Sequence, residues 1–157
     1  MSAFLGPIHM WLYKQIQIVE KREAAVISAL IKKYDDQDLL LDIYAAQAAE
    51  LAEKAKVRDN VDKFNLDDAF EIINEHFVER MPCDRLSGAV KEEEKIIWKH
   101  QSRLHQEFWQ QTEVELELMH ELYSKWLAVF IENLNPTLAH KREIESDYYN
   151  DIFFVGA

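Results

Sequence analysis

The residues best suited to chemistry gather in one short segment, where two tryptophans and two histidines lie within twelve positions: Trp98, His100, His105 and Trp109. His105 and Trp109 stand four residues apart and would share one face of a helix. Imidazole and indole rings together suit a planar or aromatic ligand, a haem, or a metal held by imidazoles. Aromatic residues at helical spacing also form ordinary core, so both interpretations stay open.

Within this segment, His105 is the expected acid–base or ligating residue. Cys83, the only cysteine, is the expected nucleophile or second ligand if a nearby histidine or arginine lowers the pKa of its thiol. Hydrolysis would also need a positioned water and a base that titrates near neutrality. The alternative for Cys83 is an inert, buried thiol. A single cysteine excludes an internal disulfide and a CxxC metal or redox motif.

A third set of polar residues lies along the predicted first helix. His9 lies on its apolar stripe and is predicted to bind a ligand or transfer a proton. The alternative is a core-edge histidine bonded to a backbone carbonyl or a carboxylate. Glu20, Arg22 and Glu23 form a charge cluster that a solvated ion pair would explain. Glu23 also falls on the apolar stripe, where a carboxylate needs a partner. His9 and Glu23 are roughly 21 Å apart along the helix and cannot share a site.

Glu117 and His120 have the Glu-x-x-His spacing of di-iron bundles. Such a site needs two of these motifs and two further glutamates, whereas this chain has one, and the apolar pattern places both residues on a solvated face. No Gly-rich phosphate loop, GxSxG or HExxH sequence is present.

Charge and hydropathy limit the partners. The 157 residues carry a net charge of −11 and no cluster of basic residues, which argues against nucleic acid and anionic membranes. No apolar run is long enough for a membrane span. We therefore expect one cytoplasmic domain, residues 1–157, with no nucleic-acid or membrane partner.

The first half of the chain predicts helices. Apolar periodicity indicates helices over 7–34, 37–55 and 66–80, with a polar connection over 56–64. In the first helix, the predicted inward stripe alternates steps of four and three residues: Leu5, His9, Leu12, Ile16, Val19, Glu23, Val26 and Leu30.

The second half predicts strands together with helices. We expect a turn near Gly88, a strand over 95–101, a short helix from 103 and a long helix over 113–134. Two β-prone runs across the polar turn Glu145-Ser146-Asp147 then suggest a hairpin. The expected fold is α+β and predominantly helical, with long helices packed against a small antiparallel sheet; the alternative is an all-α bundle.

The C-terminal segment FIENLNPTLAHKRE…DYYNDIFF, within residues 130–154, together with the order of elements, resembles the small bacterial proteins grouped with L-2-amino-thiazoline-4-carboxylic acid hydrolase. The resemblance implies an α+β fold with a small-molecule pocket. Family members tend to carry a cysteine after the middle strand and another in the final strand. Here those places hold His105 and either Asn150 or Asp151, which puts the thiazoline reaction in doubt.

Three hypotheses follow. In the first, the protein binds a small organic ligand where sheet and helices meet and hydrolyses it if the base and water are in place. His105 and Cys83 would do the chemistry, and His9, Trp98, His100 and Trp109 would bind the ligand. In the second, an all-α interaction module forms a homodimer through its first helix. The third is a haem or metal protein, although the sequence defines no metal-ligand set.

Overall fold

The computed structural model describes residues 6–80 and 84–156. The first half of the chain is helical: α1 (Gly6–Tyr34), α2 (Gln37–Asp59) and α3 (Leu66–His76). Side chains cap two of these helices, because Asp36 accepts a hydrogen bond from the Leu39 amide at 2.9 Å and Asn65 accepts one from the Asp68 amide at 2.9 Å. Within the described residues, no helix is both long enough and apolar enough to cross a membrane.

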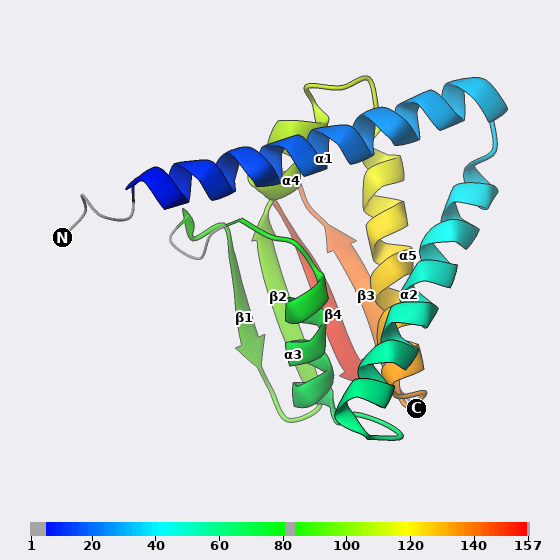
Figure 1. The fold of residues 1–157 in the computed structure, drawn as a ribbon. Helices are drawn as coiled ribbons and strands as arrows, with labels where there is room; N and C mark the ends of the chain where they lie inside the picture. The colour runs from blue at the N-terminus through cyan, green and yellow to red at the C-terminus, as the bar shows by residue number, and fades with distance from the viewer. Residues whose placement is uncertain (1–5, 81–83, 157) are drawn as a thin grey trace.

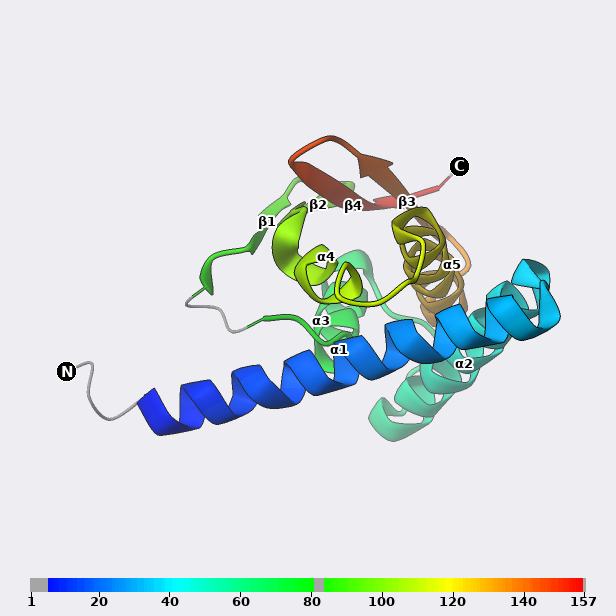
Figure 2. The ribbon, with the colours of Figure 1, turned by 90° about the horizontal axis from the view of Figure 1, so that it is seen from above.

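The second half mixes strands and helices: β1 (Ser87–Lys91), β2 (Lys95–Gln101), α4 (Arg103–Trp109), α5 (Leu116–Leu134), β3 (Leu138–Ile144) and β4 (Tyr148–Val155). The strands form one antiparallel sheet in the order β1-β2-β4-β3. The helices lie on one face of this sheet, with α3, α4 and α5 nearest to it and α1 crossing above them (Figures 1 and 2). The α+β prediction is confirmed, and the all-α alternative is wrong.

Several predicted boundaries differ from the structure, and α5 begins at Leu116 rather than at residue 113. Gly88 lies within strand β1 rather than in a turn, because residues 87–91 pair with β2. Helix α2 continues past residue 55 until Asn60, whose left-handed backbone (φ 55°) ends it. Helix α3 already ends at His76 instead of residue 80.

The buried face of α1 differs in part from the predicted stripe. Val19 and Val26 are 55% and 56% exposed, whereas Glu20, Ala24 and Ile27 are buried. A strict four–three alternation has a period of 3.5 residues and drifts around a straight helix of 3.6 residues per turn. Glu23 is nevertheless partly buried within the chain and bonded to Tyr44 and Tyr123, so part of the face predicted to form a dimer packs within one molecule.

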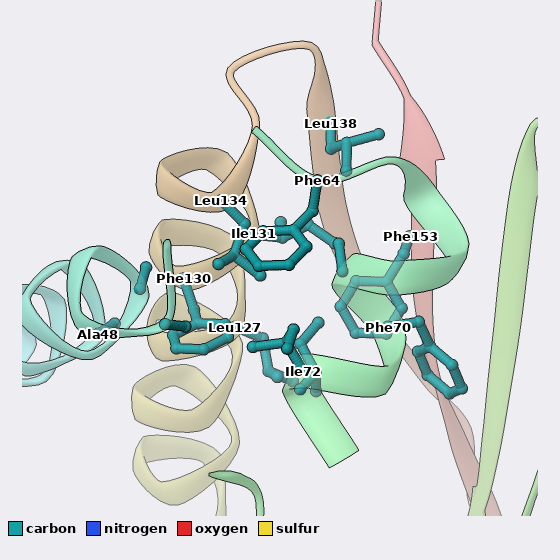
Figure 3. Packing of buried hydrophobic residues seen from close by; sticks show 14 of the residues in the cluster. Ala48, Phe64, Phe70, Ile72, Leu127, Phe130, Ile131, Leu134, Leu138 and Phe153 are labelled. Atoms are coloured by element: carbon teal, nitrogen blue, oxygen red, sulfur yellow. The ribbon is translucent and has the colours of Figure 1, made fainter. Parts of the chain in front are cut away.

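Helix α5 supplies the centre of the hydrophobic core. Leu127, Phe130 and Ile131 of α5 are fully buried between α2, α3 and the sheet (Figure 3). The N-terminal half of α5 packs in a second cluster with α1 and Trp109. Tyr44 and Phe77 contact both clusters, so the boundary between the clusters holds partly buried aromatic rings.

The turn from α5 into β3 is fixed by Asn135. Its buried side chain donates to the Phe64 carbonyl at 2.7 Å, and its Oδ1 accepts from the amide and hydroxyl of Thr137, each at 2.9 Å. The NLNPT sequence therefore ties three segments together at the end of the core.

Candidate functional site

Of the sequence-predicted site residues, His9 lies apart from the others that the structure describes. Cys83 falls outside the described residues. His9 is half-buried in the second turn of α1, with its Nε2 3.9 Å from Oδ1 of Asp84. It precedes Glu20 by eleven residues, roughly 16 Å along the helix, so His9 belongs to a different part of the surface.

Trp98 and His100 occupy the inner face of β2. Their rings are 4.5 Å apart, and the Trp98 indole makes edge contacts with Phe70 and Phe77. Both residues are buried. Trp98 is therefore part of the core, and His100 takes part in the polar cluster described below.

His105 and Trp109 come together as predicted, one turn apart on α4. Their rings stack at 5.3 Å with an angle of 10° between the planes. Each ring also contacts Glu20 of α1: Oε1 lies 2.7 Å from His105 Nδ1, and Oε2 accepts from Trp109 Nε1 at 3.0 Å. Glu20 is thus buried and bonded across 85 residues of chain, and its prediction as a solvated ion-pair residue is wrong.

These four rings fill the interior instead of enclosing a hollow. Trp98, His100, His105 and Trp109 are each at most 3% exposed. The prediction that Trp98, His100 and Trp109 bind a ligand stays a prediction, and the structure adds that all three rings are buried. The Nε2 of His105 is buried and has no hydrogen-bond partner. The hydrogen bond of this imidazole is therefore the one between Nδ1 and Glu20.

Glu23, one turn after Glu20, is held by two phenols. Its Oε1 accepts from the Tyr44 hydroxyl of α2 at 2.5 Å, and its Oε2 accepts from the Tyr123 hydroxyl of α5 at 2.6 Å. Burial raises the pKa of the Glu23 carboxyl, the two phenols oppose that shift, and the negative charge of Glu20 adds to it. The two glutamates thus bring α1, α2, α4 and α5 into one hydrogen-bonded group.

Glu20 and Glu23 reach the wall of a pocket of about 210 Å³. We call it the helical pocket, and define it by its lining residues: Val19, Glu20, Glu23, Tyr44, Gln47, Leu51, His76, Phe77, Val78, Tyr123 and Trp126. Gln47 is itself bonded, because its Oε1 accepts from Trp126 Nε1 at 2.9 Å. Carboxylates, phenols and an amide therefore converge on a hollow whose other walls are apolar or aromatic.

Comparison with known proteins identifies no relative. No protein-family model, no curated protein and no solved structure matches the chain. The resemblance to the thiazoline hydrolase group therefore stays a prediction, and the chemistry has to be argued from the geometry.

A second polar cluster lies between the sheet and α5, around Asp151 of β4. Arg142 donates to both Asp151 oxygens at 2.8 Å, and His140 Nε2 lies 2.7 Å from Oδ1. His100 Nε2 lies 3.0 Å from Oδ2, and its Nδ1 lies 2.9 Å from Glu79. Burial alone would raise the pKa of Asp151, but Arg142 and the two histidines bring it well below its ordinary value.

The sheet register explains this cluster. Trp98 and Arg142 are the residues directly opposite Asp151 on the neighbouring strands β2 and β3. Asp151 points to the helical side of the sheet, as do Tyr149 and Phe153 at alternate positions. The sequence analysis did not predict this cluster, because His140 and Arg142 alternate on one strand and only the strand pairing shows that they meet Asp151.

His120 of α5 joins the cluster. Arg142 Nη1 donates to its Nδ1 at 3.2 Å, and the Gln106 amide lies 3.1 Å from Nε2. His120 is buried, so its prediction as a residue on a solvated face is wrong. Burial and the adjacent Arg142 guanidinium lower the pKa of His120 to about 4.

We expect His120 to stay neutral down to about pH 4. Between pH 6.5 and 4 an unfolded chain would bind a proton at this imidazole and the folded chain would not, so acidification should cost about 3 kcal/mol of stability. The imidazole signal of His120, assigned by its loss in His120→Asn, should titrate near pH 4. The variant should lack that part of the pH dependence, and a midpoint near 6.5 would contradict the prediction.

A wider hollow of about 860 Å³ lies between α2, α5 and β3 and includes His120 and Arg142 in its lining. Several of its other lining residues are exposed acids, namely Asp38, Asp42, Glu117 and Glu121. The Arg142 guanidinium is already paired with Asp151. Across residues 6–80 and 84–156, no group of three or more His, Cys, Asp or Glu side chains is arranged to hold a metal ion.

Proposed function

We propose that this protein binds a small organic molecule in the helical pocket. The observation that supports the proposal is the convergence of two glutamates from one turn of α1 on a small hollow with aromatic walls. A mostly apolar hollow with a few converging polar groups and a perturbed pKa is typical of a ligand site. The volume of about 210 Å³ is below the range of drug-sized sites and suits a small metabolite.

In this proposal Glu23, Tyr44, Tyr123 and Trp126 contact the ligand, and His105 is a positioning residue. His105 holds Glu20 through the bond between Nδ1 and Oε1, as carboxylates and imidazoles orient one another in many sites. If the bound molecule is hydrolysed, Glu23 is the carboxyl at the pocket whose raised pKa suits proton transfer.

The resemblance to thiazoline hydrolases suggests hydrolysis as the reaction class. It does not provide a nucleophile, because this chain lacks the cysteines that the family tends to carry at those two places. Of the two residues at the family's final-strand cysteine, Asp151 is bound to Arg142 and two histidines. Asn150 alternates to the other face of β4. We therefore propose ligand binding as the function, in a cytoplasmic protein whose acidic, cysteine-poor composition supports that location.

A blocked pocket tests the proposal. Val19 lines the helical pocket and is 55% exposed, so Val19→Trp adds bulk at the pocket without opening the core. Val26→Trp is the matched control, because Val26 lies two turns along the same helix, is 56% exposed and does not line this pocket. Both variants should melt near the wild-type temperature.

The readout is the indole N–H resonance of Trp126 during titration with a library of small cationic, neutral and anionic molecules. We expect at least one class to shift this resonance in the wild type and in Val26→Trp, and the shift to be lost in Val19→Trp. The indole of Trp11, exposed near the start of α1, serves as the internal control. If no molecule shifts Trp126, or if Val19→Trp binds as the wild type does, the proposal fails.

A further inference from the structure

The helical pocket carries one carboxylate, Glu23, whose hydrogen-bond partners in the described part of the chain are neutral phenols. Among the residues that the structure describes, no lysine or arginine nitrogen lies within 4 Å of the Glu20 or Glu23 carboxylate. Glu20 is paired with the His105 imidazole, whereas Glu23 has no ion-pair partner among the described residues. By contrast, the buried carboxylate of Asp151 has the Arg142 guanidinium directly against it. A buried carboxylate without a positive partner is costly, so the pocket favours a ligand that brings a positive charge.

The aromatic side chains that line the helical pocket also favour a positively charged ligand. Phe77 lies 5.4 Å from Tyr123 and 5.8 Å from Trp126, at angles of 85° and 52°, and Tyr44 completes the aromatic lining. The negative face of an aromatic ring attracts ammonium groups, and cages of such rings bind them in proteins. Lysines and arginines lie over six rings elsewhere in the described structure, and none of these rings lines the pocket.

Size and donor chemistry narrow the ligand further. A volume of about 210 Å³ corresponds to roughly seven water molecules, which suits an organic ammonium ion with a few carbon atoms. Each oxygen of both glutamates already accepts one hydrogen bond from the protein and can accept another from a ligand N–H. An anionic ligand would instead face two carboxylates at close range.

We propose that the ligand of the helical pocket is a small organic ammonium ion, held by Glu23 and Glu20 and by the faces of Tyr44, Phe77, Tyr123 and Trp126. This inference depends on the proposed function and names its ligand class. Substitution of Glu23 gives the more direct test of this inference, because both of its hydrogen-bond partners are neutral phenols and need no charge on residue 23.

The experiment compares four probes of similar size: tetramethylammonium, n-butylammonium, neutral 2,2-dimethylpropanol and anionic butyrate. Binding is followed by the Trp126 indole resonance at pH 8, with Trp11 as the internal control. We expect the two ammonium ions to bind more tightly than the alcohol, and butyrate to leave the resonance unchanged.

Three variants separate local charge from overall charge. Glu23→Gln should weaken ammonium binding about tenfold, the equivalent of about 1.4 kcal/mol, and leave alcohol binding unchanged. Glu50→Gln removes the same charge at an exposed position of α2 and should have no effect. Gln47→Glu keeps an acceptor for Trp126 and adds a charge, so it should tighten ammonium binding even if Glu23→Gln fails to fold.

The outcomes distinguish the two proposals. If the alcohol or butyrate binds and the ammonium ions do not, the ammonium proposal is overturned and the pocket is still a ligand site. If ammonium ions bind but neither Glu23→Gln nor Gln47→Glu changes their affinity, the glutamates are not the cation partners and the inference also fails. If no probe and no library molecule shifts Trp126, both proposals fail.

Discussion

Replacing Asp151 by asparagine is expected to lower the free energy of unfolding by about 3–5 kcal/mol. The substitution keeps the size of the side chain but leaves the enclosed Arg142 guanidinium without its carboxylate. His140 and His100 lose the same partner. Denaturation in urea, followed by circular dichroism, measures the change.

The pH dependence of this loss has a definite sign. Because the folded-state pKa of Asp151 lies well below 3.8, the stability from its charged form is present above that value and is lost as the pH falls. The difference in the free energy of unfolding between wild type and Asp151→Asn should therefore narrow below about pH 4.

The control variant is Asp147→Asn, at an exposed position of the same hairpin, which should change the free energy of unfolding by no more than about 0.5 kcal/mol. A mild effect of Asp151→Asn at neutral pH would show that the cluster is not a stabilising ion pair.

The second large effect is expected at Phe153. Phe153→Ala should cost about 3–5 kcal/mol, because the ring is fully buried against Phe70 and the inner face of the sheet (Figure 3). Phe154 is the matched control: it is the next residue on β4 and points to the other face, where it is only half-buried.

Phe154→Ala should cost about 1 kcal/mol, since less apolar area leaves water on folding. The ratio of the two losses, measured by chemical denaturation under the same conditions, tests whether the helices cover only one face of the sheet. Equal losses would contradict the single covered face seen in Figures 1 and 2.

Local pattern was enough to predict every helix and strand except β1. The caps at Asp36 and Asn65 and the hairpin across residues 145–147 are set by residues near one another in sequence. The α+β class follows from these local signals, because alternation and helical periodicity each report the face that an element buries. Strand β1 was not predicted, because its residues, Ser-Gly-Ala-Val-Lys, are mostly exposed and show little alternation of apolar and polar side chains.

The candidate site depended on partners far away in the chain. Glu20 has the same charge and the same local neighbours whether it faces water or His105, and only the packing of α4 against α1 buries it. The sequence pattern likewise predicts His120 on the surface, and only the tertiary structure shows that it is buried next to Arg142 of β3. A signal was present for Glu23, a carboxylate on a predicted apolar stripe, and both of its phenol partners lie on other helices.

The sequence by itself therefore determined which segments are helices and strands, β1 excepted, and which side of most of them is apolar, since those choices depend on neighbours within a few residues. Only the tertiary structure decided which buried polar side chains meet. A buried charge is stabilised by groups that other segments bring to it, and here the hydrogen-bonded partners of Glu20 and Glu23 lie 21 to 100 positions away.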